Sequence, residues 1–547
     1  MTQRPDLEGV GGNLLKLSVL AAPLACLIGA FFLTAGTDET WILHGVRGLA
    51  HGGRYGSASP YVTVYSTGGL FTAVATVLEA LGGGRLLIVR LLSILSLAAL
   101  VALLIRRTPS ILGGDGTPAE RWIAAVPILG VHGTFLIGSQ AYGEILATTL
   151  LFAGAFLWAS RPAGTWSRRL AVGALFGLAA AARLNLVVGL AAIPAAAFVF
   201  SRTRREIVDA LIAAATGAVV FAIQWKGLQL LSVDVREVEQ SAGNYGLSGG
   251  VGSLGYFIPQ RLGYFAIAQD FMPLVLLVAL TAAWVVTRSR VANPRTPDLL
   301  VAFGWILWFS WLGRSPIPHL RYLWPALAAF AYVGGLVLAL VYRGLGVSPQ
   351  PAVRLAVLVV GLACGASGYV EASRNMLAGN SDILSWEWQR GCPQSLQYGP
   401  FKQLRAQRDL VRKLQELPPD QGVASIGFDT ALAYLSRRQI LPLDAYYEER
   451  VPSLAGAVRS AGLPLGTFPR WLVLTPIINR HRGCQMSPQL HQWIESNCAL
   501  RERYTGYLLY EVTGRLPEKP ELLRFNEWEP RLPLAGDESA PAERKKS

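Results

Sequence analysis

Long apolar runs alternate with short polar stretches over the first two thirds of the chain. A helix needs about 20 mainly apolar residues to cross a bilayer, and about eleven runs approach that length. They lie at 14–34, 86–105, 122–139, 144–160, 170–183, 185–201, 207–230, 264–287, 298–313, 322–342 and 354–372. The pattern predicts a mainly α-helical, polytopic membrane domain over residues 1–372. Because 170–183 is short, it forms with 185–201 either a tight hairpin or one bent helix.

The polar stretch 37–55 follows the first run and opens with adjacent carboxylates, Asp38 and Glu39. Carboxylates beside lipid are costly, so a wet, buried or ion-bearing cavity suits them better. Asp and Glu also favour the first turn of any helix, which is the alternative explanation. The next residues predict an amphipathic helix on the membrane surface. Its apolar positions are Trp41, Ile42, Val46, Leu49 and Ala50, with His44, Arg47 and His51 between them. A second surface helix is predicted at 68–81.

Composition agrees with a membrane protein that carries a more polar part. The 547 residues are 52% hydrophobic and 15% charged, and the mean hydropathy is +0.37. Soluble proteins contain about 25% charged residues. The net charge of +14 first suggests nucleic acid as a partner. However, the basic residues before 372 lie mostly in short loops between apolar runs, which is a topology signal rather than a nucleic-acid footprint.

These basic loops orient the chain. Cytoplasmic loops carry an excess of Lys and Arg. With a cytoplasmic N-terminus and eleven spans, every basic cluster of the predicted membrane domain is cytoplasmic. The clusters are Arg106, Arg107 and Arg121; Arg161, Arg168 and Arg169; Arg202, Arg204 and Arg205; Arg288, Arg290 and Arg295; and Arg343 with Arg354. We therefore predict a multi-pass protein of the inner (plasma) membrane, with an external loop at 35–85 and an extracytoplasmic C-terminal region. The first run has no convincing cleavage site and is expected to be retained as a span.

The composition changes near residue 373. Strand-like segments at 423–427, 439–443, 471–475 and 507–512 alternate with helical ones at 430–438, 452–461 and 487–496. This order predicts an extracytoplasmic α/β domain over 373–528 with a partly parallel sheet. No Gly-rich loop follows a strand, so nucleotide binding is unsupported. Residues 529–547 are rich in Pro, Ala and charge, as in a disordered tail.

The order of these features resembles the GT-C superfamily of integral-membrane glycosyltransferases, most closely the branch of protein O-mannosyltransferases and lipid A aminoarabinose transferases. Four motifs carry the resemblance. They are Asp38-Glu39 opening a surface helix that ends in Gly-Gly and Tyr55; Tyr142 and Glu144 at the start of a span; Arg183 in a short loop; and His319, Arg321 and Tyr322 opening a late span. Thr40 and Trp41 depart from the commonest form of the helix start.

The resemblance implies a glycosyltransferase that moves a sugar from a polyprenyl-phosphate carrier to a glycan, lipid or protein acceptor on the extracytoplasmic face, with inversion. Asp38 is expected to be the general base, with Glu39 as the second catalytic candidate. The leaving phosphate is assigned to Arg183, His319, Arg321 and Tyr322, and substrate contacts to Glu144, Tyr142, His44 and Tyr55. The acidic pair also suits Mg²⁺ or Mn²⁺, although the resemblance leaves a metal requirement open.

Three other functions compete with this one. A transporter or flippase of lipid-linked sugars would also have many spans, but it would place charges near the middle of the bilayer and commonly contain internal repeats. A polymerase or ligase of lipid-linked glycans shares the enzyme class, and donor labelling would separate it. A non-catalytic membrane scaffold would not need the acidic pair.

Overall fold

The structure is a computed structural model. It describes residues 7–33, 35, 37–55, 68–114, 117–159, 165–232, 271–314, 320–344, 350–378, 402–426, 430–442, 469–474, 488–505 and 507–514. The chain divides into two compact units, Met1–Gly391 and Cys392–Ser547. The last described helix of the first unit ends at Ala378, six residues beyond the predicted end of the membrane domain at 372.

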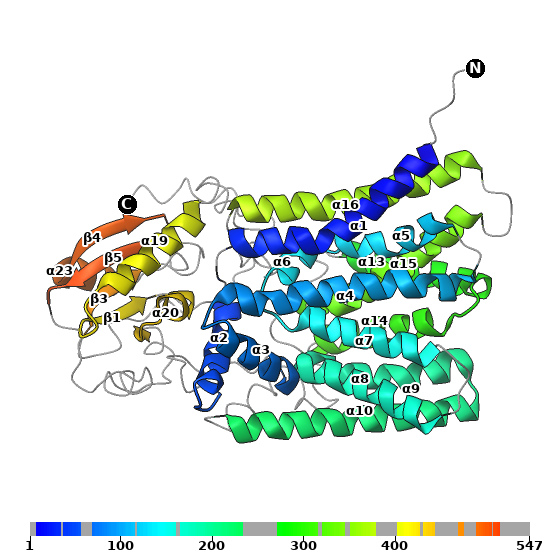
Figure 1. Cartoon of the computed structure of the whole chain (residues 1–547), viewed down its shortest axis with the longest axis horizontal. Coiled ribbons are helices and arrows are strands. Elements are labelled where there is room, and N and C mark those ends of the chain that lie inside the picture. The colour runs from blue at the N-terminus through cyan, green and yellow to red at the C-terminus, as the bar shows by residue number, and fades with distance from the viewer. Residues whose placement is uncertain are drawn as a thin grey trace, which may run out of the picture. The chain divides into compact units, whose positions relative to one another are not determined.

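Long apolar helices run side by side through the first unit (Figure 1). They are α1 Leu7–Phe32, α4 Leu86–Leu112, α7 Glu144–Ala159, α8 Trp166–Ala182, α10 Arg204–Leu231, α13 Phe271–Thr287, α14 Arg295–Arg314, α15 Trp324–Arg343 and α16 Pro351–Ala378. Large apolar side chains also face outward, such as Leu17, Ile223 and Val370, each more than 60% exposed. In a helix all backbone groups bond internally, so such a bundle is stable in lipid.

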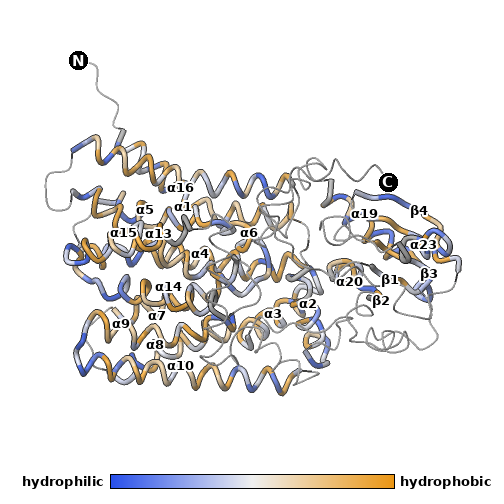
Figure 2. The backbone as a smooth tube through the Cα atoms, turned by 180° about the vertical axis from the view of Figure 1, so that it is seen from behind, coloured by the Kyte–Doolittle hydropathy of each residue, from blue (hydrophilic) through white to orange (hydrophobic). Residues whose placement is uncertain are grey.

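Six described segments are long and apolar enough to cross a membrane: Glu8–Phe32, Leu86–Leu112, Leu184–Ser201, Arg204–Leu231, Trp324–Arg343 and Pro351–Leu377. Apolar colour follows these helices along their length in Figure 2. The protein is therefore a multi-pass membrane protein, while the count of eleven spans and the orientation remain predictions.

Two of the predicted spans are broken. Residues 122–139 form α5 Pro118–Ala125, the 3₁₀ segment η1 Val126–Gly130 and α6 Thr134–Gly138. Residues 185–201 form η2 Leu184–Ala191, α9 Ala192–Ala196 and the π-helical η3 Ala197–Ser201. Arg183 is extended (φ −144°, ψ 114°), and α8 packs against η2 beyond it. The chain therefore turns at Arg183, as the hairpin predicts.

Two short helices occupy one end of the bundle. These are α2 Thr37–Ala50, which runs across the direction of the long helices, and α3 Gly69–Leu81 (Figure 1). Both predicted surface helices are thus confirmed as helices. The Arg47 side chain of α2 pairs with the buried Glu79 of α3, with Nε 2.9 Å from Oε1. This ion pair joins the two helices at the end of the bundle that carries the candidate site.

The second unit contains a five-stranded sheet in the order β2-β1-β3-β5-β4. Its elements are α19 Lys402–Glu416, β1 Gly422–Ile426, α20 Thr430–Ser436, β2 Ile440–Pro442, β3 Pro469–Leu474, α23 Pro488–Asn497, β4 Cys498–Tyr504 and β5 Tyr507–Val512. β1 is parallel to β2 and β3, and β5 is antiparallel to β3 and β4. The core includes Leu410, Val423, Leu432 and Leu509. Strand β4 was not predicted, and the predicted helix at 452–461 and tail at 529–547 lie outside the described residues.

Glycines bring α8 and α10 into close contact. A Cβ atom at Gly173 would overlap the carbonyl oxygen of Ala213, and one at Gly177 would lie 2.5 Å from the carbonyl oxygen of Gly217. Small residues commonly permit such close packing between membrane helices.

We expect Gly173→Ala to lower the thermal stability of the purified protein, because the added methyl meets backbone atoms of α10 and such overpacking costs about 1–3 kcal/mol. Gly227→Ala is the matched control in α10, since a Cβ there has no neighbour within 4 Å. It should leave the melting temperature equal or slightly higher, because Ala favours a helix over Gly by about 1 kcal/mol. Thermal unfolding in detergent measures both. Equal melting temperatures for Gly173→Ala and the wild type would contradict the close approach.

Candidate active site at one end of the bundle

A buried ion pair joins α2 to α4. The Glu39 carboxylate is fully buried and accepts hydrogen bonds from Nε and Nη2 of Arg90, at 2.9 and 2.7 Å. The backbone amide of Ala141 donates to the same carboxylate at 2.6 Å. Nη1 of Arg90 donates to the carbonyl oxygens of Ala30 and Leu33, at 2.7 and 3.3 Å. Arg90 thus ties the end of α1 and the start of α2 to α4, and Glu39 joins the segment before α7 to the same cluster.

A second buried ion pair lies where α7 begins and α8 ends. Nη2 of Arg183 is 2.9 Å from Oε1 of Glu144, and both side chains are at most 1% exposed. The Arg183 guanidinium lies over the ring of Tyr322, 4.6 Å from its centroid. Nδ2 of Asn185 donates to the Tyr322 carbonyl oxygen at 2.8 Å. These contacts fix the 3₁₀ turn η5 Leu320–Leu323 against the end of α8.

Residues 140–144 connect the two ion pairs. The Ala141 amide binds Glu39, and three residues later the Glu144 side chain binds Arg183. Between them, the buried Tyr142 accepts a 3.0 Å hydrogen bond at its carbonyl oxygen from Oγ of Ser93 in α4. The structure therefore brings Glu39, Tyr142, Glu144, Arg183 and Tyr322 into one connected set, as their predicted positions at the ends of spans require.

Glycines permit this local geometry. A Cβ on Gly143 would lie 2.6 Å from the carbonyl oxygen of Ala182, and one on Gly68 would overlap the carbonyl oxygen of Ala181. Gly68 also donates its amide to the Ala182 carbonyl oxygen at 3.4 Å. The loop before α7 and the start of α3 can therefore both approach the backbone immediately before Arg183.

Two predicted substrate contacts are packed inside the protein. The Tyr55 ring is fully buried against Gly45, where a Cβ atom would overlap it. The Tyr55 amide donates to the Leu231 carbonyl oxygen at 2.7 Å, so Tyr55 anchors the chain after α2 to the end of α10. His44 in α2 is 3% exposed. Such burial favours a role in packing for Tyr55 and offers His44 little access to a substrate.

For three other predicted site residues, the structure describes either the backbone alone or nothing. His319 is outside the described residues. Asp38 is described as backbone in α2, and Arg321 as backbone in η5. Their helices nevertheless place them beside the two ion pairs. Asp38 precedes Glu39, and Arg321 precedes Tyr322.

The donor set around Glu39 does not suit a metal ion. Both of its carboxylate oxygens already accept hydrogen bonds from Arg90, which removes Glu39 from the candidate ligands. In the part of the chain that the structure describes, no three His, Cys, Asp or Glu side chains come together as a metal would need. A divalent cation therefore stays a prediction that rests on Asp38.

Sequence reasoning missed Arg90. Its signal was its position inside the apolar run 86–105, because an arginine in a membrane helix needs a buried partner. The partner is Glu39, 51 residues earlier in the chain. Glu144 and Arg183 were both named, but for separate tasks, and the structure pairs them with each other.

Comparison with known proteins supports the fold. No protein-family model and no curated protein sequence matches the chain. The crystal structure of ArnT from Cupriavidus metallidurans bound to undecaprenyl phosphate matches at 13% identity and a TM-score of 0.55, over 90% of this chain and 97% of that chain. The apo structure of the same protein matches at 14% identity and a TM-score of 0.53, over 93% of this chain and 98% of that one. The resemblance to GT-C glycosyltransferases is thus confirmed at the level of the fold.

We expect Arg90→Ala to destabilise the protein strongly, because it leaves the Glu39 carboxylate buried without its partner, at a cost of about 3–5 kcal/mol. Arg85→Ala is the matched control, since Arg85 is exposed just before the same helix. The double variant Glu39→Gln/Arg90→Met should recover part of the loss, because no lone charge remains. Melting temperatures in detergent give all three results. Equal losses for Arg90→Ala and Arg85→Ala would contradict the role of the buried Glu39–Arg90 ion pair, which we call the Glu39 clamp.

Proposed function

We propose that this protein is a membrane glycosyltransferase that moves a sugar from a polyprenyl-phosphate carrier to an acceptor on the extracytoplasmic face. The acceptor class is a glycan, a lipid or a protein. Support comes from the fold shared with ArnT, and from the acidic pair at the start of α2. The observation that carries the proposal is the clamp on Glu39, because it separates the tasks of the two adjacent carboxylates.

Glu39 is the positioning residue in this proposal. Its oxygens face Arg90 and the Ala141 amide, so it is not free to accept a proton from a substrate. Asp38 directly precedes Glu39 in α2, so the ion pair of Glu39 also fixes the backbone of Asp38. We assign to Asp38 the role of general base.

The phosphate side of the site is assigned to Arg321 and His319. Arg183 was one of the phosphate candidates from the sequence, but its charge is already matched by the buried Glu144. In the proposal, Arg183 and Asn185 instead hold Tyr322 in place. This anchors the neighbouring Arg321, whose planar guanidinium suits two phosphate oxygens.

The reaction is a single displacement. The acceptor hydroxyl oxygen attacks the anomeric carbon while the Asp38 carboxylate accepts the hydroxyl proton. The bond between the anomeric carbon and the phosphate oxygen breaks, and its electron pair leaves with polyprenyl phosphate. Arg321 and His319 stabilise the negative charge that develops on that oxygen. Attack opposite the leaving group inverts the anomeric carbon.

The position of the charges favours this function over transport. Glu39, Arg90, Glu144 and Arg183 lie within about a turn of the ends of their helices. Transporters commonly bind their substrates near the middle of the bilayer between broken helices. A site at one mouth of the bundle instead suits a lipid-linked donor whose phosphate lies in the interface.

We expect Asp38→Asn to lower the turnover number by about 10²–10⁴, the usual contribution of a general base. Membranes containing the protein are supplied with a panel of radiolabelled polyprenyl-phosphate sugars, and the label that leaves the carrier is counted. Glu8→Gln is the control, because Glu8 lies in the first turn of α1, apart from the candidate site. Its carboxylate pairs there with Arg354 of α16. Normal membrane levels with normal transfer in Asp38→Asn would exclude Asp38 as the base. If wild-type membranes release no label from any of these carriers, the proposed donor class is excluded.

We expect Arg321→Ala to raise the Michaelis constant for the lipid donor about tenfold or more, because a charged hydrogen bond to the phosphate contributes about 1.5–3 kcal/mol. Arg107→Ala is the control, an exposed arginine of α4 on the predicted cytoplasmic side. Initial rates against donor concentration measure the effect. An unchanged Michaelis constant in Arg321→Ala would remove Arg321 from the phosphate site.

A further inference from the structure

A groove of about 690 Å³ lies between α1, α4 and α5, away from the candidate active site. Its lining is mostly apolar, with Leu20, Pro23, Ala98, Val101, Ala102, Ile105, Pro109 and Trp122, and it includes Arg106 and Arg121. Arg106 follows Arg90 by sixteen residues along α4, about 24 Å at 1.5 Å per residue. The groove therefore lies toward the end of α4 opposite to the Glu39 clamp.

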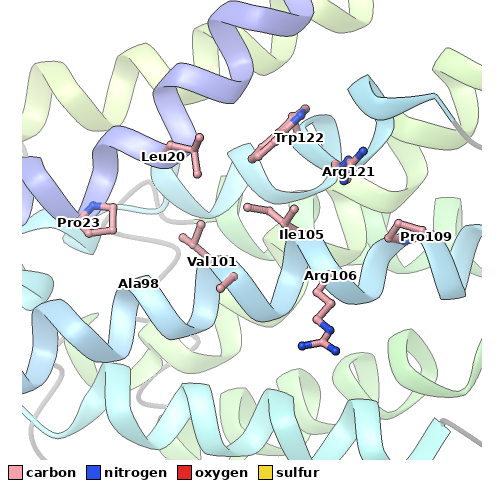
Figure 3. Close-up of a pocket in the computed structure, with 10 residues that line it drawn as sticks. Leu20, Pro23, Ala98, Val101, Ile105, Arg106, Pro109, Arg121 and Trp122 are labelled. Carbon is pink, nitrogen blue, oxygen red and sulfur yellow. The ribbon is translucent and has the colours of Figure 1, made fainter.

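The groove follows from a bend in α1. Pro23 lies inside this helix, where it removes one backbone hydrogen bond and kinks the chain. Figure 1 shows α1 diverging from α4 toward its N-terminal end. In Figure 3, Leu20 of α1 faces Val101 and Ile105 of α4 across the space that this divergence opens. A volume of this size is typical of ligand sites.

Two arginines belong to the lining of the groove, and one lysine lies a helical turn from it. Arg121 lies beside Trp122 on α5, and Arg106 extends from α4 (Figure 3). Both residues belong to the lining of the groove. Lys16 lies one helical turn before Leu20, on the same face of α1. Within the described residues, none of these three cations has a carboxylate partner. The carboxylate next in sequence, Glu120, binds Arg343 and the Thr117 amide instead.

We propose that this groove is a binding site for an anionic phospholipid, with an acyl chain along the apolar lining and the phosphate at the end of the groove that carries Arg106 and Arg121, with Lys16 nearby. The predicted topology places these cations on the cytoplasmic side, where the leaflet carries anionic lipid. Basic pockets between membrane helices on that side bind anionic headgroups. A lone guanidinium beside hydrocarbon is costly, and a lipid phosphate supplies the missing counter-charge. This site is independent of the proposed glycosyl transfer.

The test is lipid binding by the purified full-length protein, measured by native mass spectrometry with equal amounts of phosphatidylglycerol and phosphatidylethanolamine. We expect the wild type to retain phosphatidylglycerol preferentially. Arg106→Gln/Arg121→Gln should weaken its retention about tenfold or more, because two cations near the phosphate are lost. Arg204→Gln, which changes an exposed arginine at the start of α10, is the matched control and should bind like the wild type.

A second variant separates the groove from general surface charge. Ala102 is exposed and lines the groove, so Ala102→Phe should fill it without disturbing the core, and an unchanged melting temperature will verify the fold. It should reduce phosphatidylglycerol retention with every cation in place. Normal retention in Ala102→Phe, equal losses in the double variant and Arg204→Gln, or equal retention of both phospholipids would each overturn the proposal. Displacement of phosphatidylglycerol by equimolar undecaprenyl phosphate, itself abolished in Ala102→Phe, would assign the groove to the prenyl carrier instead.

Discussion

The hydrogen bonds of one buried arginine hold together the end of the bundle on which the candidate site depends. Removing a guanidinium and a carboxylate from water costs several kcal/mol per ion, which only good geometry and further hydrogen bonds offset. Arg90 meets that condition. Nε and Nη2 face both oxygens of Glu39, and Nη1 reaches carbonyl oxygens of Ala30 and Leu33. Carbonyls at the end of a helix lack helical partners and carry partial negative charge, so Arg90 also caps α1.

The second ion pair extends this rigidity across the site. Glu144 begins α7 and Arg183 ends α8, and the short segment 140–144 connects them to the Glu39 clamp. The residues of both ion pairs lie in helices or directly beside a helix end, not in long loops. Catalytic groups need positions fixed within a fraction of an ångström, which rigid elements provide better than loops. In our proposal, Asp38 and Arg321 act beside these two anchors, so the anchors set the distance between base and leaving group.

The sequence predicted the helices and strands more readily than the contacts between them. Apolar runs located the long helices because lipid requires about 20 apolar residues per span. The break at 126–133 was missed because its residues are mostly apolar, although Pro127 and the left-handed Gly133 (φ 82°) mark it locally. A tertiary contact adds to these signals, since a Cβ at Gly130 would lie 2.8 Å from the Cys364 carbonyl oxygen. Strand β4 was missed because CALRERY is charged and half-exposed. The residue types of the site followed from charge at the ends of spans, but the pairing of Glu39 with Arg90 joins residues 51 apart, and no local pattern encodes it.

Charge compensation distinguishes structural cations from those that bind ligands. An arginine that already faces a buried carboxylate has little net field left to attract an anion, as with Arg90 and Arg183. A leaving phosphate must therefore be met by other cations, which is why we assign it to Arg321 and His319. The same criterion applies at the opposite end of α4. Arg106 and Arg121 line an apolar groove without carboxylate partners among the described residues, so their charge remains available to an anion from outside the chain. The arginines at the two ends of α4 thus have different roles. The charge of Arg90 is neutralised by a carboxylate of the chain itself, whereas we assign the counter-charge of Arg106 to a membrane lipid.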